Sequence, residues 1–301
     1  MPSPNPAFWR IVLGFALTML TPVGLLVGLV MLARAAAPDA LGGIAQLGNG
    51  ATPLAALAML CTIIASLPVL AVVLRALHHV PLTWLFAAGP QRWRWFFAAI
   101  ALVLAVQLAM LALPGGQDVQ QNIALPLWLV WLAPALLVIL LQSATEELIF
   151  RGYLQRMLRA RFVALWPAFL IPSLLFGLGH YTPHIYGQNA WLVVAVTALW
   201  GLILAHLTWQ CGSILPAIGI HFANNCVAIL LMSSTMQMSG LALFVAPLDP
   251  NDIAATRAML LQTGLMQLSL YALYQLGRAQ YRKPARDRAS TVLHSPPPPS
   301  I

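Results

Sequence analysis

The sequence predicts an all-α fold, a polytopic transmembrane helix bundle with about eight spans, and three observations support this prediction. Of the 301 residues, 60% are hydrophobic and 7% are charged, whereas about 25% of the residues of a soluble domain are charged. The mean hydropathy is +0.84, so most of the surface is expected to face lipid. The apolar residues form runs that approach or exceed the ~20 residues needed to cross a bilayer, at about 11–32, 52–74, 95–113, 126–150, 162–180, 191–210, 213–234 and 257–277.

The first run has two features of a secretory signal peptide. Arg10 precedes it, and the small-residue sequence Ala33-Arg34-Ala35 follows it. The apolar core of a signal peptide, however, has only about 7–15 residues, and this run is longer. We therefore interpret residues 11–32 as a retained membrane anchor.

The basic residues predict the orientation of the chain. They concentrate in alternate links between the runs and in the C-terminal segment, at Arg75, Arg92, Arg94, Arg156, Arg159, Arg161, Arg278, Arg282, Lys283, Arg286 and Arg288. The opposite links hold Asp39, Asp118, Asp249 and Asp252. Since basic loops stay on the cytoplasmic side, we expect a multi-pass protein of the cell (inner) membrane with both termini cytoplasmic.

The chain is expected to form one domain. Residues 1–281 are predicted to be a single transmembrane bundle with a motif-bearing core at 126–234, and residues 282–301 a disordered, basic, proline-rich cytoplasmic tail. Membrane lipid is the expected surroundings, and the scattered arginines do not favour nucleic acid as a partner. The three cysteines, Cys61, Cys211 and Cys226, fit no disulfide framework. The sequence does not indicate an oligomeric state.

The only two glutamates, Glu146 and Glu147, are adjacent and fall within a membrane run. A charged side chain at membrane depth costs at least about 2.5 kcal/mol, so such residues are usually functional. Glu147 and Arg151 are four residues apart and can pair on one helix face, whereas Glu146 points about 100° away. The pattern favours Glu147 as the partner of Arg151 and Glu146 as the group left for chemistry. The alternative is a helix end whose charges extend to the cytoplasmic interface.

Two further polar clusters lie in later runs. Phe176 and His180 end the fifth run, and His221 and Asn225 lie four apart in the seventh. A lone histidine in a span often makes only a hydrogen bond between helices. Together with Glu146, however, these side chains could hold and deprotonate a water, or bind a divalent metal such as zinc through His180 and His221. The chain has no HExxH motif, and the residue types leave both options open.

Convergence of these clusters depends on their depth in the membrane. Glu146 precedes the basic turn near residue 160 by about 14 residues, and His180 follows that turn by about 20. Straight helices would therefore place the two side chains at depths that differ by roughly 9 Å. Helix tilt, or a kink at Pro167 or Pro172, would be needed to bring them level.

The three motifs in this order resemble the CPBP family of intramembrane proteases, which includes the CAAX prenyl endopeptidase type and bacteriocin-processing or immunity proteins. The motifs are EExxxR, FxxxH and HxxxN, here Glu146, Glu147 and Arg151, Phe176 and His180, and His221 and Asn225. The resemblance implies a CAAX-type intramembrane endopeptidase, with or without a metal, that cleaves a membrane-associated protein or peptide.

The resemblance also implies a role for each motif residue. Glu146 would activate the attacking water, and His180 would orient that water or bind a metal. His221 and Asn225 would complete the catalytic set, with Asn225 stabilising the oxyanion. Glu147 and Arg151 would fix the end of the helix and its local charge, and Phe176 would support the catalytic residues.

Two other classes of function use the same residues. A proton-coupled transporter would employ the buried glutamate and histidines as a relay, and it would be expected to show a continuous polar path and internal repeats. The sequence displays neither feature. A non-catalytic immunity or scaffold protein of the membrane would bind a partner without needing Glu146 or His221.

Overall fold

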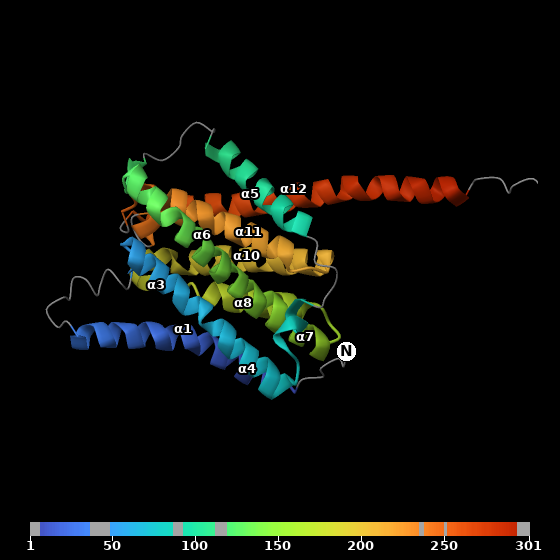
Figure 1. The fold of residues 1–301 in the computed structure, drawn as a ribbon. Coiled ribbons are helices and arrows are strands. Elements are labelled where there is room, and N and C mark those ends of the chain that lie inside the picture. The colour runs from blue at the N-terminus through green and yellow to red at the C-terminus, as the bar shows by residue number, and fades with distance from the viewer. Residues whose placement is uncertain are drawn as a thin grey trace, which may run out of the picture.

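The computed structural model of the chain describes residues 7–36, 49–86, 93–111, 119–234, 238–249 and 252–293. These residues are overwhelmingly helical, which confirms the all-α prediction (Figure 1). The α-helices are α1 (Phe8–Ala36), α3 (Pro53–Ile64), α4 (Ser66–His78), α5 (Trp93–Leu111), α6 (Leu125–Glu147), α7 (Arg156–Arg161), α8 (Trp166–Leu178), α9 (Pro183–Tyr186), α10 (Ala190–Cys211), α11 (Leu215–Cys226) and α12 (Ile253–Leu293). Two π-helical segments, η2 (Leu148–Gln155) and η4 (Val227–Leu231), continue α6 and α11.

Five helical stretches of the described residues are long and apolar enough to cross a membrane. They are Phe8–Ala36, Pro53–His78, Trp93–Met110, Leu125–Arg161 and Pro183–Cys211. Two shorter apolar helices, Trp166–Leu178 and Leu215–Leu231, occupy the fifth and seventh predicted runs. The eighth run lies in α12, which is not among the five. These helices support a multi-pass membrane location, and the number of eight spans stays a prediction.

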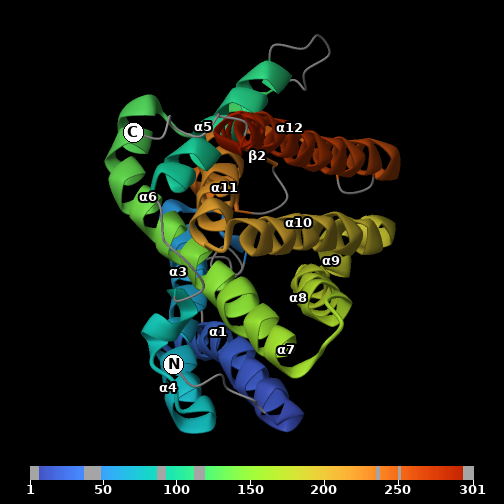
Figure 2. The same cartoon turned by 90° about the vertical axis from the view of Figure 1, so that its right-hand side faces the viewer.

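The helices pack into a bundle around α6, α10 and α11 (Figure 2). Helix α10 lies against α8 on one side and against α12 on another, while α11 lies against α5 and α6. Helix α1 packs mainly on α4 and α3. Close approach of α8 and α10 requires glycine, because a Cβ added at Gly177 would come within 2.5 Å of the Val194 carbonyl oxygen.

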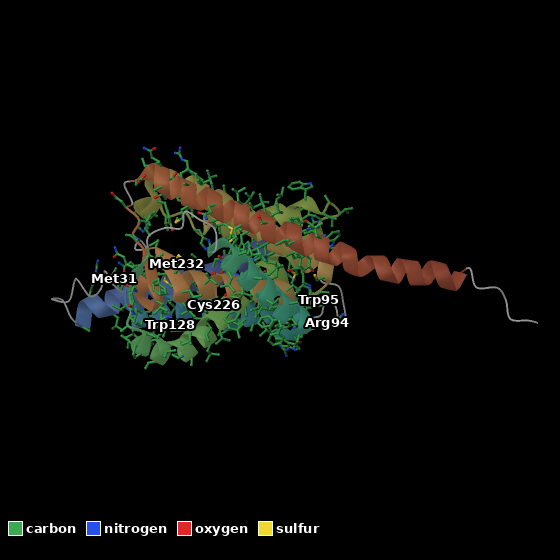
Figure 3. The ribbon with its side chains drawn as sticks, turned by 90° about the horizontal axis from the view of Figure 1, so that it is seen from above. Met31, Arg94, Trp95, Trp128, Cys226 and Met232 are labelled. Atoms are coloured by element: carbon green, nitrogen blue, oxygen red, sulfur yellow. The ribbon has the colours of Figure 1, made fainter. Side chains whose placement is uncertain are left out.

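Arginines gather at one end of this bundle, which we call the arginine-rich end. Arg10 donates to the Leu77 carbonyl of α4, and Arg278 of α12 donates to the carbonyl of Gln210 near the end of α10. Arg156, the first residue of α7, donates to the Trp84 carbonyl. Figure 3 shows Arg94 towards this end and Met31 and Met232 towards the other, the arginine-poor end.

A small sheet that the sequence did not predict lies at the arginine-poor end. Its strand order is β1 (Gln120–Gln121), β3 (Phe244–Ala246), β2 (Met232–Ser234), with an antiparallel and a parallel pairing. The Asn122 side chain donates to the carbonyls of Ser239 and Ala242. The backbone amide of Gly240 donates to Gly50, just before α3. The sheet is thereby fastened to the ends of α3 and α6.

The predicted disordered tail at residues 282–301 stays a prediction. Helix α12 is assigned to Leu293, and residues 294–301 lie outside the described part of the chain. Of the residues that carry the orientation prediction, Asp39, Arg92 and Asp118 also lie outside the described residues.

Candidate active site

The two glutamates lie where α6 widens into the π-helix η2. The helix is continuous from Leu125 to Arg161, and all eight residues of η2 are buried. π-Helical turns are rare and frequently occur at functional sites, because the wider turn redirects the side chains that follow it. Helix α11 also becomes π-helical immediately after the HxxxN motif. Two of the three helices that carry the predicted site, α6 and α11, are therefore locally widened beside it.

Glu147 is fully buried and is held by two other motif residues. Arg151 donates from Nη1 to Glu147 Oε1 at 2.8 Å, so the expected ion pair is present. The other terminal nitrogen of Arg151 donates to the Gly201 carbonyl of α10 at 3.0 Å. His221 Nδ1 lies 2.8 Å from the same Glu147 oxygen. The second carboxylate oxygen, Oε2, has no hydrogen-bond partner among the described residues.

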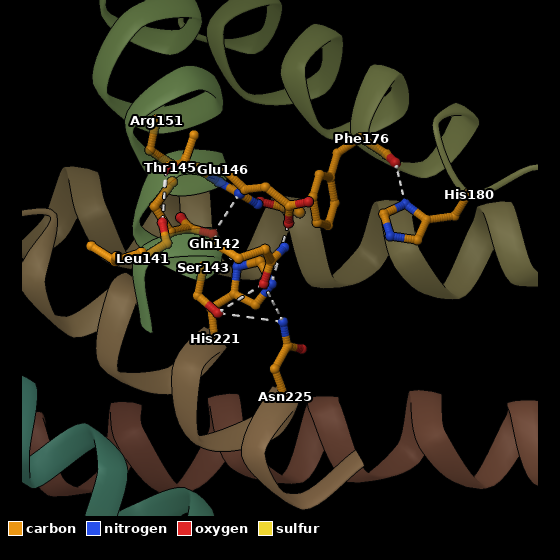
Figure 4. Close-up of polar contacts among 12 residues, drawn as sticks. Leu141, Gln142, Ser143, Thr145, Glu146, Arg151, Phe176, His180, His221 and Asn225 are labelled. Carbon is orange, nitrogen blue, oxygen red and sulfur yellow. Dashed lines mark hydrogen bonds and ion pairs between the residues drawn. The ribbon is translucent and has the colours of Figure 1, made fainter. Parts of the chain in front are cut away.

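The contact with His221 is an addition to the sequence interpretation, which paired Glu147 with Arg151 and treated Glu146 as separate. His221 Nε2 lies 3.4 Å from Glu146 Oε2 (Figure 4). Because Nδ1 contacts Glu147, one imidazole ring lies between both carboxylates. The Glu146 side chain is 13% exposed and that of Glu147 is 0% exposed. Of the two carboxylates, Glu146 is therefore the one that a water or substrate can reach.

Phe176 forms an aromatic wall of the site. The Arg151 guanidinium lies 5.0 Å from the centre of its ring, a distance at which cation and ring attract each other. The rings of His180 and His221 lie 5.0 Å and 6.0 Å from it, and the His221 ring is nearly perpendicular. Phe176 therefore contacts the members of all three motifs and helps to fix their orientation.

His180 follows the C-terminal end of α8. Its Nδ1 lies 2.8 Å from the Phe176 carbonyl oxygen, so Nδ1–H donates and Nε2 is the ring atom left for other contacts. No hydrogen bond or ion pair joins His180 to Glu146 or His221 within the described structure. Glu146 and His180 line one cavity, so the two side chains converge despite the predicted difference in depth. Since α8 begins at Trp166, His180 lies 14 residues beyond the start of the returning segment, as far as Glu146 lies from residue 160.

Asn225 completes a polar group with two side chains from α6. Its Nδ2 donates to Gln142 Oε1 at 3.1 Å and to Ser143 Oγ at 3.4 Å. The sequence interpretation did not include Gln142 or Ser143 in the site. Gln142 could have been found, because it lies one helical turn before Glu146 and so shares its face.

A cavity of about 430 Å³ joins the four residues that the sequence predicts to be catalytic. Glu146 of α6, His180 beyond α8, and His221 and Asn225 of α11 all line it. Further walls come from α1, α3, η4 and the residue before the short 3₁₀-helix η5 (Ser239–Leu241). The other lining residues are Pro22, Val23, Leu26, Met59, Leu60, Thr62, Ile63, Gln142, Gly179, Ile229 and Met238. The cavity can admit water and a stretch of peptide.

The geometry of the site also bears on the predicted metal. Within the described residues, no three side chains of His, Cys, Asp or Glu are arranged to hold a metal ion. Both ring nitrogens of His221 already face glutamate oxygens, so the donors as placed do not fit a zinc site built on His180 and His221. We therefore derive no step through a metal.

Comparison with known proteins confirms the resemblance that the motifs predict. Residues 126–227 match the family described as type II CAAX prenyl endopeptidase Rce1-like. The chain is also 30% identical over 150 residues to the uncharacterized protein YyaK of Bacillus subtilis (strain 168). That alignment covers 48% of this chain and 48% of YyaK, so it spans about half the length of the curated relative. No solved structure gives a significant match. The family match covers all three motifs.

Proposed function

We propose that the chain is an intramembrane endopeptidase that hydrolyses a peptide bond of a membrane-associated protein or peptide with a glutamate-activated water. One observation carries the proposal. Glu146, His180, His221 and Asn225 come from three separate membrane segments and line one cavity. It costs free energy to bury a carboxylate, two imidazoles and an amide at membrane depth, so these groups are expected to have a function. Amide hydrolysis is a reaction that needs such groups.

In the proposed mechanism, Glu146 takes a proton from a water in the cavity while the water oxygen attacks the carbonyl carbon of the scissile bond. The carbonyl oxygen becomes an oxyanion, which the Asn225 amide stabilises by donating a hydrogen bond in place of its longer contact with Ser143. The proton held by Glu146 then passes to the leaving amine as the carbon–nitrogen bond breaks. His180 orients the water through Nε2, while Glu147 and Arg151 position His221.

Replacement of Glu146 with glutamine tests the proposal directly, because it removes the base and keeps the shape of the side chain. We expect Glu146→Gln to abolish cleavage, measured as new protein N-termini by mass spectrometry of membranes that contain either form. Asp252→Asn is the matched control, since Asp252 lies outside the cavity and asparagine can also accept from the Ala255 amide. Cleavage at the wild-type rate in Glu146→Gln would overturn the assignment. Intact function after loss of both Glu146 and His221 would point to the non-catalytic binding role instead.

We also propose the inner membrane as the location, with both termini and the arginine-rich end cytoplasmic, on the basis of the arginine distribution. A cysteine at Val163, which is fully exposed in the turn between α7 and α8, would test this orientation. We expect a membrane-impermeant maleimide to label it only after the cells are opened, and labelling of intact cells would reverse the assignment.

A further inference from the structure

A second cavity adjoins the candidate active site. It has a volume of about 250 Å³ and lies between α1 and α3. Its lining is apolar throughout, with Leu26, Leu29, Val30, Leu32, Ala36, Ala58 and Met59. Leu26 and Met59 also line the cavity that contains Glu146. The two cavities are therefore neighbours that share a wall, one apolar and one rich in hydrogen-bonding groups.

The α1 wall of this second cavity is loosely attached to the bundle. Pro22 lies inside α1, where it removes a backbone hydrogen bond and weakens the helix locally. Before Pro22 the helix is anchored, since Ile11 and Thr18 are buried. Beyond Pro22, a Cβ added at Gly24 or Gly28 would meet no atom within 4 Å. The second half of α1 therefore has few contacts that would resist its displacement from α3.

Both cavities lie towards the arginine-poor end. Met59 precedes His78, at the arginine-rich end of α4, by 19 residues, which places it about 28 Å away along the helices. Met238, beside the sheet of the arginine-poor end, lines the active-site cavity as well. In the opposite direction, the buried residues of η2 fill the space between Glu146 and the arginine-rich end. The observed lining thus leads from the active site to the arginine-poor half of the membrane.

We propose that the substrate enters sideways from the lipid of the arginine-poor half, between α1 and α3, with an apolar peptide segment in the second cavity and the scissile bond beside Glu146. This inference rests on the proposed endopeptidase function. A peptide is the occupant that matches both cavities. One continuous molecule must offer apolar side chains to Leu29 and Ala58 and a hydrogen-bonding backbone to Gln142 and Asn225.

The size of the second cavity sets the length of that segment. From Leu26 to Ala36, α1 rises about 15 Å, which corresponds to four or five residues of extended peptide at roughly 3.3 Å each. The substrates inferred here are therefore membrane proteins or peptides with a short apolar stretch beside the cleavage site, in the leaflet of the arginine-poor end. By the proposed orientation, this is the outer leaflet.

A reporter with a defined anchor tests the route. The probe is a span of about 20 Leu and Ala residues joined to a randomised juxtamembrane segment. It is inserted into the membrane in both orientations, so that the randomised segment lies on one side or the other. A soluble peptide library of the same segment serves as the comparison. We expect Ala58→Trp, which fills the second cavity, to lower the ratio of anchored to soluble cleavage at least tenfold. Leu54→Trp is the matched control, because Leu54 lies on the same helix, is exposed and lines neither cavity.

A reversible block keeps the test independent of folding. In a chain with its native cysteines replaced by alanine, Leu26→Cys and Met59→Cys are joined by a thiol cross-linker that contains a disulfide. We expect cross-linking to stop cleavage of the anchored reporter and reduction to restore it. Unchanged cleavage in both the cross-linked chain and Ala58→Trp would overturn the route, as would cleavage confined to reporters displayed at the arginine-rich end. Preference for a palmitoylated reporter without the apolar peptide would overturn the peptide as occupant. If the wild type cleaves neither reporter nor soluble library, the endopeptidase function itself fails, and the route fails with it.

Discussion

Replacement of Arg151 with methionine is expected to destabilise the protein strongly, because Arg151 compensates a fully buried carboxylate. Arg151 is itself 1% exposed and donates to both Glu147 and the Gly201 carbonyl. Methionine keeps most of the apolar volume and removes the charge. Breaking a buried ion pair by removal of one partner typically costs about 3–5 kcal/mol, since the remaining charge is left uncompensated. We expect Arg151→Met to lie in this range.

The comparison of single and double variants separates the ion pair from simple packing. In Arg151→Met combined with Glu147→Gln, both charges are absent, so we expect the double variant to be more stable than Arg151→Met alone. Stability would be measured as reversible unfolding of the purified protein in mixed micelles at increasing fractions of denaturing detergent. Arg94→Met serves as control, because Arg94 is exposed, and such surface changes usually stay within about 0.5 kcal/mol.

Two results would refute this account of the buried pair. A loss of stability in Arg151→Met no larger than in Arg94→Met would mean that Glu147 does not carry a charge that needs Arg151. A double variant less stable than Arg151→Met would mean that the pair acts mainly through packing and not through charge. Arg151→Lys is also informative, because lysine restores the charge but cannot contact Glu147 and Gly201 as a planar fork. We expect it to recover part of the lost stability.

Three further predictions follow from the site. If Asn225 stabilises the oxyanion, Asn225→Ala should lower kcat about 10²–10³-fold with a smaller change in KM. Both constants would be measured on a substrate peptide identified by N-terminal mass spectrometry, and a change in KM alone would contradict that role. Chelation of divalent metals should leave cleavage unchanged in the glutamate-activated mechanism, and loss that zinc restores would instead support the metal prediction for His180 and His221. Gly177→Val should destabilise the protein by about 1–3 kcal/mol because the added atoms collide with Val194 of α10, and wild-type unfolding behaviour would refute the close packing of α8 on α10.

The helical fold could be predicted from composition and run length, because lipid requires each spanning segment to satisfy its own backbone. The start of α8 could not be predicted in this way. Residues Phe162 to Leu165 are apolar like the helix that follows, yet they form the turn, and hydropathy does not distinguish an apolar turn from an apolar helix. That offset produced the predicted depth mismatch between Glu146 and His180. The strands of two and three residues could not be predicted either, since alternation of apolar and polar residues cannot be recognised over so short a length.

Within the site, the spacing of residues along one helix predicted which side chains pair on that helix. Contacts between side chains of different helices could not be predicted from the sequence. The pair Glu147–Arg151 follows from a separation of four residues. The position of His221 between the two glutamates depends on how α11 packs against α6, and no periodicity within either segment contains that information. Gln142 lies between these cases, because its place on the Glu146 face was predictable while its hydrogen bond to Asn225 was not.

The shared contact with His221 couples the two glutamates of the site. His221 Nδ1 donates to the Glu147 carboxylate, so its Nε2 faces Glu146 either as a lone pair or as a second N–H. The imidazole ring contacts both carboxylates, so a change at His221 alters the surroundings of Glu146 and Glu147 together.

This shared contact predicts that Glu146 and His221 act as one unit. His221→Gln removes the ring nitrogen that lies 3.4 Å from Glu146 Oε2, so Glu146 is expected to lose the contact that positions it as a base. The double variant Glu146→Gln, His221→Gln should then be no slower than either single variant, since residues that act as a unit are strongly non-additive. His206→Gln is the matched control, because His206 is a membrane histidine that contacts Tyr271 and Gln210 outside the site. Multiplicative losses in the double variant would show that the two residues contribute independently, and the proposed coupling through the shared contact would have to be abandoned.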